Sequence, residues 1–484
     1  MNRSHIVARN VLVTLAAQMI LWALSFGVTL YLPGYLKDSG LGTLTLAGSY
    51  AAILSVIVGL GTSKVLVKEI ARDRTRTGEL VVACLFMRLI LGMCAVLVGW
   101  LGTRLLHYPV SLQRLIMMAL GVMVVNQLSE VLTNGLAGLE EFPKQNASLL
   151  TERVVSSILI IGLVILHQPL WMFIPVVLVG LSASIGSSCY MLRRYLVSFP
   201  RLTGNTIRLL AQSGMPFLMA GVFVAVYGES DALLLSKISG VAAIGWYSLA
   251  KRLGGSTMVI PVALSSTMLP TLSRRHLEDP SAFRAAVRRL LRLMMICVTP
   301  ISAVLVLAPG QILTLLHYPP AYRHSIPVLM LMGSAIILWY LSQAVGTALI
   351  ASDRQGVFGK ITGIAALVSV PLCATCILTT QRIMTNGAVG AMLSDVLLEL
   401  FMMMAYIRAL PRGVFDWHPL SILGRTAIAA LPFALSLYAM HSRHDLLWPI
   451  LGLILYPFGC YLLRCLCPDD LQMLRQVGRK FARA

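Results

Sequence analysis

Long apolar segments set the strongest constraint on what this chain can fold into. The segment from Val11 to Pro33 contains no charged residue, and neither do 293–316 and 326–350. The apolar stretches 80–100 and 115–139 contain one charged residue each. A helix needs about 20 mainly apolar residues to cross the hydrocarbon core of a bilayer. Helices also keep their backbone hydrogen bonds internal, as lipid requires, and the alternating pattern of membrane β-strands is absent. We therefore expect an all-α polytopic membrane protein.

The composition agrees with a bilayer as the solvent. The chain is 57% hydrophobic and only 12% charged, whereas soluble domains carry about a quarter charged residues. We predict about fourteen transmembrane helices, which would occupy residues 11–33, 41–67, 80–102, 115–139, 147–167, 169–192, 209–235, 240–272, 293–316, 326–350, 361–380, 388–410, 426–442 and 446–466. Short connections at 147–192 and 426–466 leave a count between twelve and fourteen open.

The net charge of +20 is explained by topology rather than by nucleic acid. With the N-terminus inside, most of the 39 Lys and Arg residues fall in inner loops and tails, as the positive-inside rule requires. This asymmetry predicts a multi-pass protein of the cell (plasma or inner) membrane with both termini cytoplasmic. The first apolar run exceeds the about 7–15 residues of a signal-peptide core, so we interpret it as a retained helix.

An internal repeat divides the chain. Leu105-Leu106-His107-Tyr108-Pro109 recurs as Leu315-Leu316-His317-Tyr318-Pro319, each after an odd-numbered span. Gly42-Thr43-Leu44-Thr45-Leu46-Ala47 likewise matches Gly245-Trp246-Tyr247-Ser248-Leu249-Ala250. We predict two six-helix lobes, 1–208 and 209–410, related by a parallel pseudo-twofold. Residues 411–484 would add two transmembrane helices and a cytoplasmic tail.

The sequence lacks the patterns of common catalytic and cofactor sites. No phosphate-binding loop or dinucleotide fingerprint is present, and no long outer loop could house a reaction. The Cys373-Ala-Thr-Cys376 pair sits in an apolar run without nearby His, so we interpret both thiols as small buried hydrophobes. We expect no enzyme activity, no catalytic residue, no metal and no cofactor.

The inner segment 273–292 combines six arginines with Phe283, Val287, Leu290 and Leu291. This pattern is compatible with an amphipathic helix lying on the anionic inner leaflet. A solvated basic loop that fixes the topology is an equal alternative.

Ionisable residues inside spans are functional candidates by default, because each is costly at the bilayer centre. Lys251 and Arg252 lie about 16 Å along their span at 1.5 Å per residue, and we interpret them as cations for an anionic headgroup. Asp395 and Glu399, four residues apart on one helix face, lie at a comparable depth. Internal pairing of these carboxylates with the two cations is the alternative.

The remaining charges in the apolar regions each allow two interpretations. Arg88 would line a cavity or, as the position of Glu130 at similar depth favours, form an ion pair inside the first lobe. Lys64 would meet a headgroup or extend to the inner surface. Glu229 and Asp231 would hold a coupling cation or simply face water.

A family resemblance rests on short motifs in the first eight spans. These are Tyr31-Leu32-Pro33, Leu41-Gly42, Gly59-Leu60-Gly61, Val67-Lys68-Glu69-Ile70-Ala71-Arg72-Asp73, Asp231, Gly245-Trp246-Tyr247-Ser248-Leu249-Ala250-Lys251-Arg252 and Leu269-Pro270-Thr271-Leu272-Ser273. In their order and spacing the chain resembles the oligosaccharide (O-antigen, Wzx-type) flippases of the polysaccharide-transport family. That family belongs to one superfamily with the multidrug and toxin extruders and the lipid II flippases.

The resemblance implies alternating access around a cationic, V-shaped cavity between two six-helix lobes. It implies transport of an undecaprenyl-pyrophosphate-linked oligosaccharide across the cell membrane for surface polysaccharide synthesis, alongside glycosyltransferases and a polymerase. It makes Lys64, Asp231, Lys251 and Arg252 candidate cavity residues. A gradient of H⁺ or Na⁺, or the substrate gradient itself, would drive transport, and the sequence leaves these alternatives open. The first span lacks the arginine of some relatives, which makes a lipid II substrate less favoured. An ion-coupled multidrug exporter is the main alternative.

Overall fold

The structure, a computed structural model, describes residues 3–195, 203–411, 413–414, 418–443, 447–463 and 465. Within these ranges the side chains of residues 3–25, 418–420, 439–443 and 447–449 are not described. All regular elements in the described part of the chain are helical. They group into two compact units, residues 1–248 and 249–484, with the boundary inside helix α8, Val241–Ser256.

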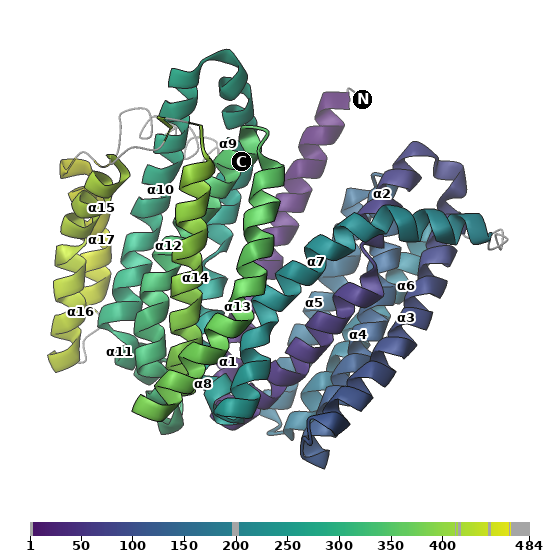
Figure 1. The fold of residues 1–484 in the computed structure, drawn as a ribbon, viewed down its shortest axis with the longest axis horizontal. Helices are drawn as coiled ribbons and strands as arrows, with labels where there is room; N and C mark the ends of the chain where they lie inside the picture. The colour runs from purple at the N-terminus through teal and green to yellow at the C-terminus, as the bar shows by residue number, and fades with distance from the viewer. Residues whose placement is uncertain are drawn as a thin grey trace. The chain divides into compact units, whose positions relative to one another are not determined.

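The first unit contains the following elements in chain order: α1 Arg3–Gly59, α2 Thr62–Arg72, α3 Thr77–Leu105, α4 Val110–Gly138, α5 Phe142–Ile165, α6 Phe173–Leu192, α7 Gly204–Ile238 and the start of α8. Helix α4 packs against α1, α3 and α6, and α5 packs against α6 and α1. Helix α7 lies along α1 and also contacts α2 and α3. This arrangement, drawn in Figure 1, places α4 at the centre of the unit.

Helix α1 covers the first predicted span and most of the second, and its two parts are separated by a kink at one non-helical residue. The bend lies at Lys37, whose φ of 58° and ψ of −177° are not helical. Pro33, one turn earlier, lacks the N–H that the helix would use. A second break separates α1 from α2, where Leu60 and Gly61 have φ of 46° and 64°. The predicted span 41–67 therefore contains a break near its inner end.

The second unit contains the rest of α8 and then α9 Val259–Glu278, α10 Pro280–Leu307, α11 Pro309–Leu315, the 3-10 turn η3 Pro320–Ser325, α12 Ile326–Ala351, α13 Gln355–Met384, α14 Gly387–Ala409, α15 His418–Ala429, α16 Leu431–Arg443 and α17 Leu447–Leu462. Helix α12 packs against α10 and α14, and α14 packs against α13. Helices α15 to α17 form a group beside α10.

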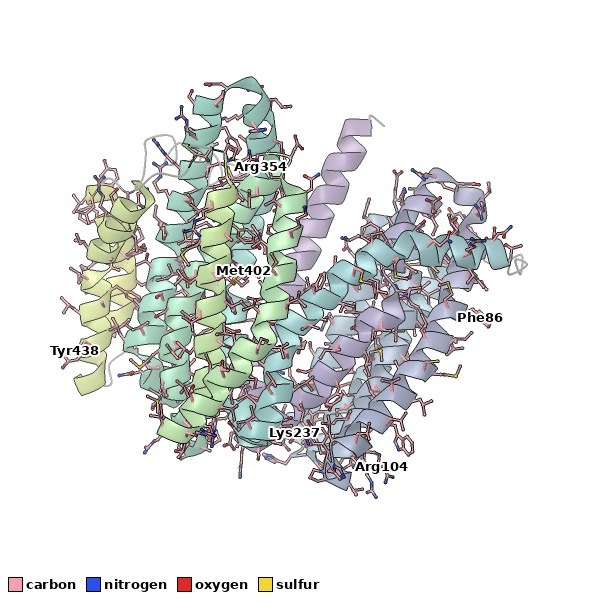
Figure 2. The ribbon with its side chains drawn as sticks, in the orientation of Figure 1. Phe86, Arg104, Lys237, Arg354, Met402 and Tyr438 are labelled. Carbon is pink, nitrogen blue, oxygen red and sulfur yellow. The ribbon has the colours of Figure 1, made fainter. Side chains whose placement is uncertain are left out.

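Apolar side chains point outward from several of the long helices. On α3, Met93 and Leu97 are exposed, and Figure 2 shows Phe86 pointing away from the first unit. On α16, Tyr438 points outward in the same way. Inside the first unit, Leu66, Leu80 and residues around them form a buried core. Helices that are apolar on both faces are typical of a bilayer environment.

Within the described residues, each predicted span overlaps one helix or two consecutive helices. Eleven helices in the searched, described residues are long and apolar enough to cross a membrane. The bent pair 421–438 would raise that number to twelve, and residues 450–462 form a shorter apolar helix. The first predicted span lies mainly on the part of α1 without described side chains. These findings are compatible with about fourteen spans and confirm the all-α polytopic fold.

The division into compact units does not coincide with the predicted lobes. The first unit extends to residue 248, whereas the predicted lobe boundary is at 208. Contacts of α7 with α1, α2 and α3 account for this difference. The lobes 1–208 and 209–410 and the addition 411–484 describe a sequence repeat, and they stay a prediction.

The repeated pentapeptide folds into the same turn twice. His107 and His317 end their helices in the left-handed region, with φ of 50° and 52°. In each copy the histidine N–H and the N–H groups on either side of it donate to matching carbonyls of the preceding helical turns. Glu140 and Asp353, after α4 and α12, form a second pair of left-handed caps, with φ of 63° and 58°. The repeat is therefore also visible in local structure where the sequence match is lost.

The basic segment 273–292 forms the end of α9 and the start of α10. Asp279 caps α10 by accepting hydrogen bonds from Ser281 N at 2.8 Å and Ala282 N at 3.2 Å. Phe283, Val287 and the other apolar residues of this helical face are buried in the protein. Of the two alternatives, a helix with its apolar face on the leaflet does not fit, because protein covers that face. A solvated loop does not fit either, because the segment is largely helical.

Candidate functional site

An ion pair lies at the centre of the first unit, as the similar depths of its partners predicted. Arg88 on α3 donates from Nη1 to Glu130 Oε2 at 3.1 Å and to the carbonyl of Gln127 at 2.8 Å. From Nη2 it donates to Ser63 Oγ at 2.6 Å. The Ser63 hydroxyl in turn donates to Glu130 Oε1 at 2.7 Å, and Asn134 Nδ2 donates to the same oxygen at 3.3 Å.

The two partners of this ion pair differ in how far their side chains are exposed. The side chain of Arg88 is 1% exposed, whereas that of Glu130 is 41% exposed. A ligand or ion can therefore reach Glu130 but not the guanidinium. This favours the structural interpretation of Arg88 over its interpretation as a cavity residue.

Two carboxylates of α7 are held by hydroxyl groups from neighbouring helices. The Ser49 hydroxyl of α1 donates to Glu229 Oε2 at 2.7 Å. The Tyr247 phenol of α8 donates to Asp231 Oδ2 at 2.5 Å. Asp231 is buried and Glu229 half-buried, so neither simply faces water. The sequence placed these acids at the end of a span but did not indicate their donors.

Lys64 lies in the first turn of α2, directly after the break at Gly61. Its side chain is exposed, and Nζ lies 5.2 Å from the ring centroid of Phe217 on α7. No side chain caps the first turn of α2, so its N–H groups add the partial positive charge of a helix N-terminus to that of the ammonium. This end of α2 is consequently electropositive.

The cations of α8, Lys251 and Arg252, are both half-buried. Within the part of the chain that the structure describes, Arg252 makes no hydrogen bond and no ion pair, and its electrostatic neighbour is Tyr322 of η3. The predicted alternative, pairing with Asp395 or Glu399, is therefore not seen for Arg252. Both acids are buried on α14, and pairing with Lys251 stays a prediction.

Residues that the sequence interpretation missed act mainly as hydrogen-bond donors around the carboxylates. Ser63, Ser49 and Tyr247 belong to this group. Only Tyr247 carried a signal, because it lies within the Gly-Trp-Tyr-Ser-Leu-Ala motif. Hydroxyl groups in apolar helices are too frequent to be singled out without their neighbours. A search of the described residues found no group of three or more His, Cys, Asp or Glu that could hold a metal.

Comparison with known families gives two matches. A model described as polysaccharide biosynthesis protein matches residues 7–276, and the MatE model matches residues 216–375. The chain is 24% identical over 228 residues to a protein of Haloferax volcanii named probable flippase AglR. That match covers 46% of each protein, so it spans about half the length of the curated relative.

Solved structures share the fold. The lipid II flippase MurJ in an inward closed conformation is 13% identical, with a TM-score of 0.72 over 95% of this chain and 99% of that one. An inward-facing multidrug resistance transporter of the MATE family, in the MOP superfamily, is 14% identical, with a TM-score of 0.65 over 85% and 98%. A MOP superfamily transporter from Pyrococcus furiosus gives 14% identity and 0.53 over 83% and 94%. At these identities the likeness shows the fold alone. The resemblance drawn from the motifs is confirmed by the family match over residues 7–276.

Proposed function

Because this chain belongs to the polysaccharide biosynthesis protein family, we propose that it is a flippase for a lipid-linked oligosaccharide. The substrate would be an oligosaccharide on undecaprenyl pyrophosphate, moved from the inner to the outer leaflet of the cell membrane for surface polysaccharide synthesis. The family match carries this proposal, since it extends over residues 7–276 and includes Lys64, Asp231, Lys251 and Arg252.

The chemistry of Arg252 supports an anionic substrate. Within an apolar span, a guanidinium without a carboxylate or hydrogen-bond acceptor is unfavourable. A pyrophosphate would supply two or more acceptor oxygens, and the planar fork of Arg binds such groups bidentately. The partnerless state of Arg252 among the described residues is therefore consistent with a site that is completed by its ligand.

Lys64 offers a second cationic position. Its ammonium and the uncapped start of α2 both favour a negative headgroup, as half-helix N-termini do in transporters. Lys251, next to Arg252, would add a point charge. In this mechanism the polyprenyl tail stays in lipid while the pyrophosphate and sugars cross, so the cations stabilise the charge during its passage.

The energy source would be an ion gradient or the substrate gradient. The sequence holds no phosphate-binding loop. Glu130, Glu229, Asp231, Asp395 and Glu399 are the carboxylates that we propose as positions for H⁺ or Na⁺ or as structural pairs. Glycosyltransferases and a polysaccharide polymerase would act before and after transport.

The test is the lipid-linked oligosaccharide pool in cells depleted of the protein, measured by mass spectrometry. We expect a finished undecaprenyl-pyrophosphate oligosaccharide to accumulate, and wild type to clear it. Lys251→Ala/Arg252→Ala should fail to clear it, while Arg382→Ala, which removes an exposed cation at the end of α13, should behave as wild type. Clearance by the double variant would leave the flippase standing and remove these cations from its site.

An ion-coupled multidrug exporter is the second candidate, favoured by the MatE match over residues 216–375. It predicts no oligosaccharide accumulation on depletion and a raised sensitivity to cationic drugs. A lipid II flippase is a third candidate on the same fold, and it predicts accumulation of lipid II instead. The same depletion experiment separates all three.

A further inference from the structure

The predicted outer end of α7 contacts the turn between α3 and α4. Lys237 Nζ lies 3.7 Å from the ring centroid of Tyr108 and donates to the carbonyl of Leu106. The neighbouring residue of α7, Ser236, shares a hydrogen bond of 2.6 Å with the Tyr108 phenol. Two consecutive residues of α7 thus hold three different groups of one turn. Figure 2 shows Lys237 and Arg104 at the same end of the first unit.

The turn is built so that these groups face α7. His107 adopts a φ of 50°, which reverses the chain directly after α3 and leaves the Leu106 carbonyl outside the helical ladder. Gln113 Nε2 donates to the Tyr108 carbonyl at 2.7 Å and fixes the far side of the turn. Tyr108 is 7% exposed, and the Tyr50 ring of α1 meets it edge-on at 6.1 Å. The phenol is therefore inserted and held, rather than lying on the surface.

These contacts can be broken and replaced by contacts with water. Lys237 is exposed, so water can replace the carbonyl and the aromatic face around its ammonium. The Tyr108–Ser236 hydrogen bond is enclosed while it is formed, but water would offer both hydroxyl groups equivalent partners once α7 moves away. Buried apolar packing would have no such substitute. Water can thus compensate for the polar contacts that would be lost when α7 moves away from the turn.

Its position links it to the candidate transport groups. Asp231 and Glu229 lie six and eight residues before Lys237 on the same helix, about 9 and 12 Å away at 1.5 Å per residue. Movement of the outer end of α7 would displace both carboxylates relative to Ser49 of α1. The residues that contact the turn and the two carboxylates therefore belong to the same helix.

We propose that Lys237, Ser236 and Tyr108 form an outer clasp that holds α7 on the α3–α4 turn and must open once in each transport cycle. The clasp rests on the proposed transport function, since a protein that moves no substrate would have no need to open it. It adds a gate to that function, at residues outside the cationic positions described above.

A reversible crosslink between α7 and the turn tests whether the clasp must open during transport. Leu106→Cys/Lys237→Cys, bridged by a short bifunctional thiol reagent with a cleavable disulfide link, should lose transport and regain it on reduction. Gly102→Cys/Leu106→Cys, bridged within one helix end, is the matched control and should keep transport. Each single cysteine variant, treated alike, controls for the native thiols. Wild-type transport by the fully bridged Leu106/Lys237 variant would overturn the proposal.

A labelling experiment separates failure of the clasp from failure of the proposed function. A membrane-impermeant maleimide should label Ser236→Cys slowly, and Lys237→Met in the same chain should raise the rate about tenfold by raising the open population. This readout needs no substrate, so it stands even if no oligosaccharide accumulates on depletion. An unchanged labelling rate would contradict the proposed clasp, whatever the substrate is.

Discussion

Gly42 and Gly245 meet backbone to backbone, although 203 residues separate them in the chain. A Cβ placed on Gly42 would lie 2.9 Å from Gly245 N and would overlap the carbonyl oxygen of Val241. A Cβ placed on Gly245 would overlap the carbonyl oxygen of Asp38. These are the first residues of the two matched hexapeptides, so both copies of the repeat supply a glycine to one crossing. The indole of Trp246 donates to Asp38 Oδ2 at 3.0 Å beside it.

Gly42→Ala and Gly245→Ala should each destabilise the protein, because the atoms they meet are main-chain atoms that cannot rotate away. Overpacking of this kind typically costs about 1–3 kcal/mol. Thermal unfolding in detergent, followed by size-exclusion fluorescence, measures the shift. Gly48→Ala is the control, since a Cβ there has nothing within 4 Å. Equal melting temperatures for all three variants would contradict the crossing.

The Arg88–Glu130 pair should respond unequally to removal of its partners. Glu130→Ala strands a buried guanidinium, and breaking such a pair typically costs about 3–5 kcal/mol. Arg88→Met leaves a carboxylate that is 41% exposed and can be solvated, so its cost should be smaller. A double-mutant cycle on thermal stability measures both effects and the coupling. A larger cost for Arg88→Met than for Glu130→Ala would show that the burial asymmetry has no energetic consequence.

His317→Gly should leave the protein as stable as wild type or more stable, by up to about 1 kcal/mol, because the left-handed conformation of position 317 strains any residue with a Cβ. His317→Val should destabilise it, since branching at Cβ worsens the strain. Arg323→Gly, in a right-handed turn nearby, should destabilise instead. Melting temperatures of the three variants decide, and a loss of stability in His317→Gly would indicate that the imidazole itself makes a needed contact.

Stability should fall in acid partly through Asp279. Hydrogen bonds from the side chain and backbone of Ser281 lower the pKa of this carboxyl below its ordinary value of 3.8. A lowered pKa means that the stabilisation is complete above that ordinary value and is lost as the pH falls towards the folded-state pKa.

Comparison of the wild type with Asp279→Asn from pH 6 to pH 2.5 measures this contribution. The melting-temperature gap between them should shrink as the pH drops below about 4. A gap that stays constant down to pH 2.5 would exclude a role for Asp279 ionisation.

The helices of this protein could be predicted because their signal is local. An apolar run of about 20 residues in lipid satisfies its backbone as a helix, and each predicted span overlaps a helix in the described part of the chain. The repeat could also be recognised in the sequence, because the pentapeptide occurs twice. In the structure both copies fold into the same left-handed turn. The Arg88–Glu130 pair was also predicted, because depth along two antiparallel spans can be counted from the sequence.

Only the tertiary structure decided which surfaces and charges are covered. Periodicity marked the apolar face of residues 280–291 but not the protein that buries it, and it gave no reason to expect Arg252 without a partner among the described residues. It did not indicate that Lys237 would contact the ring of Tyr108, or that Gly42 would pack against Gly245. Hydropathy and spacing are properties of one segment, whereas pairing, burial and close approach depend on the neighbours that packing brings from elsewhere in the chain.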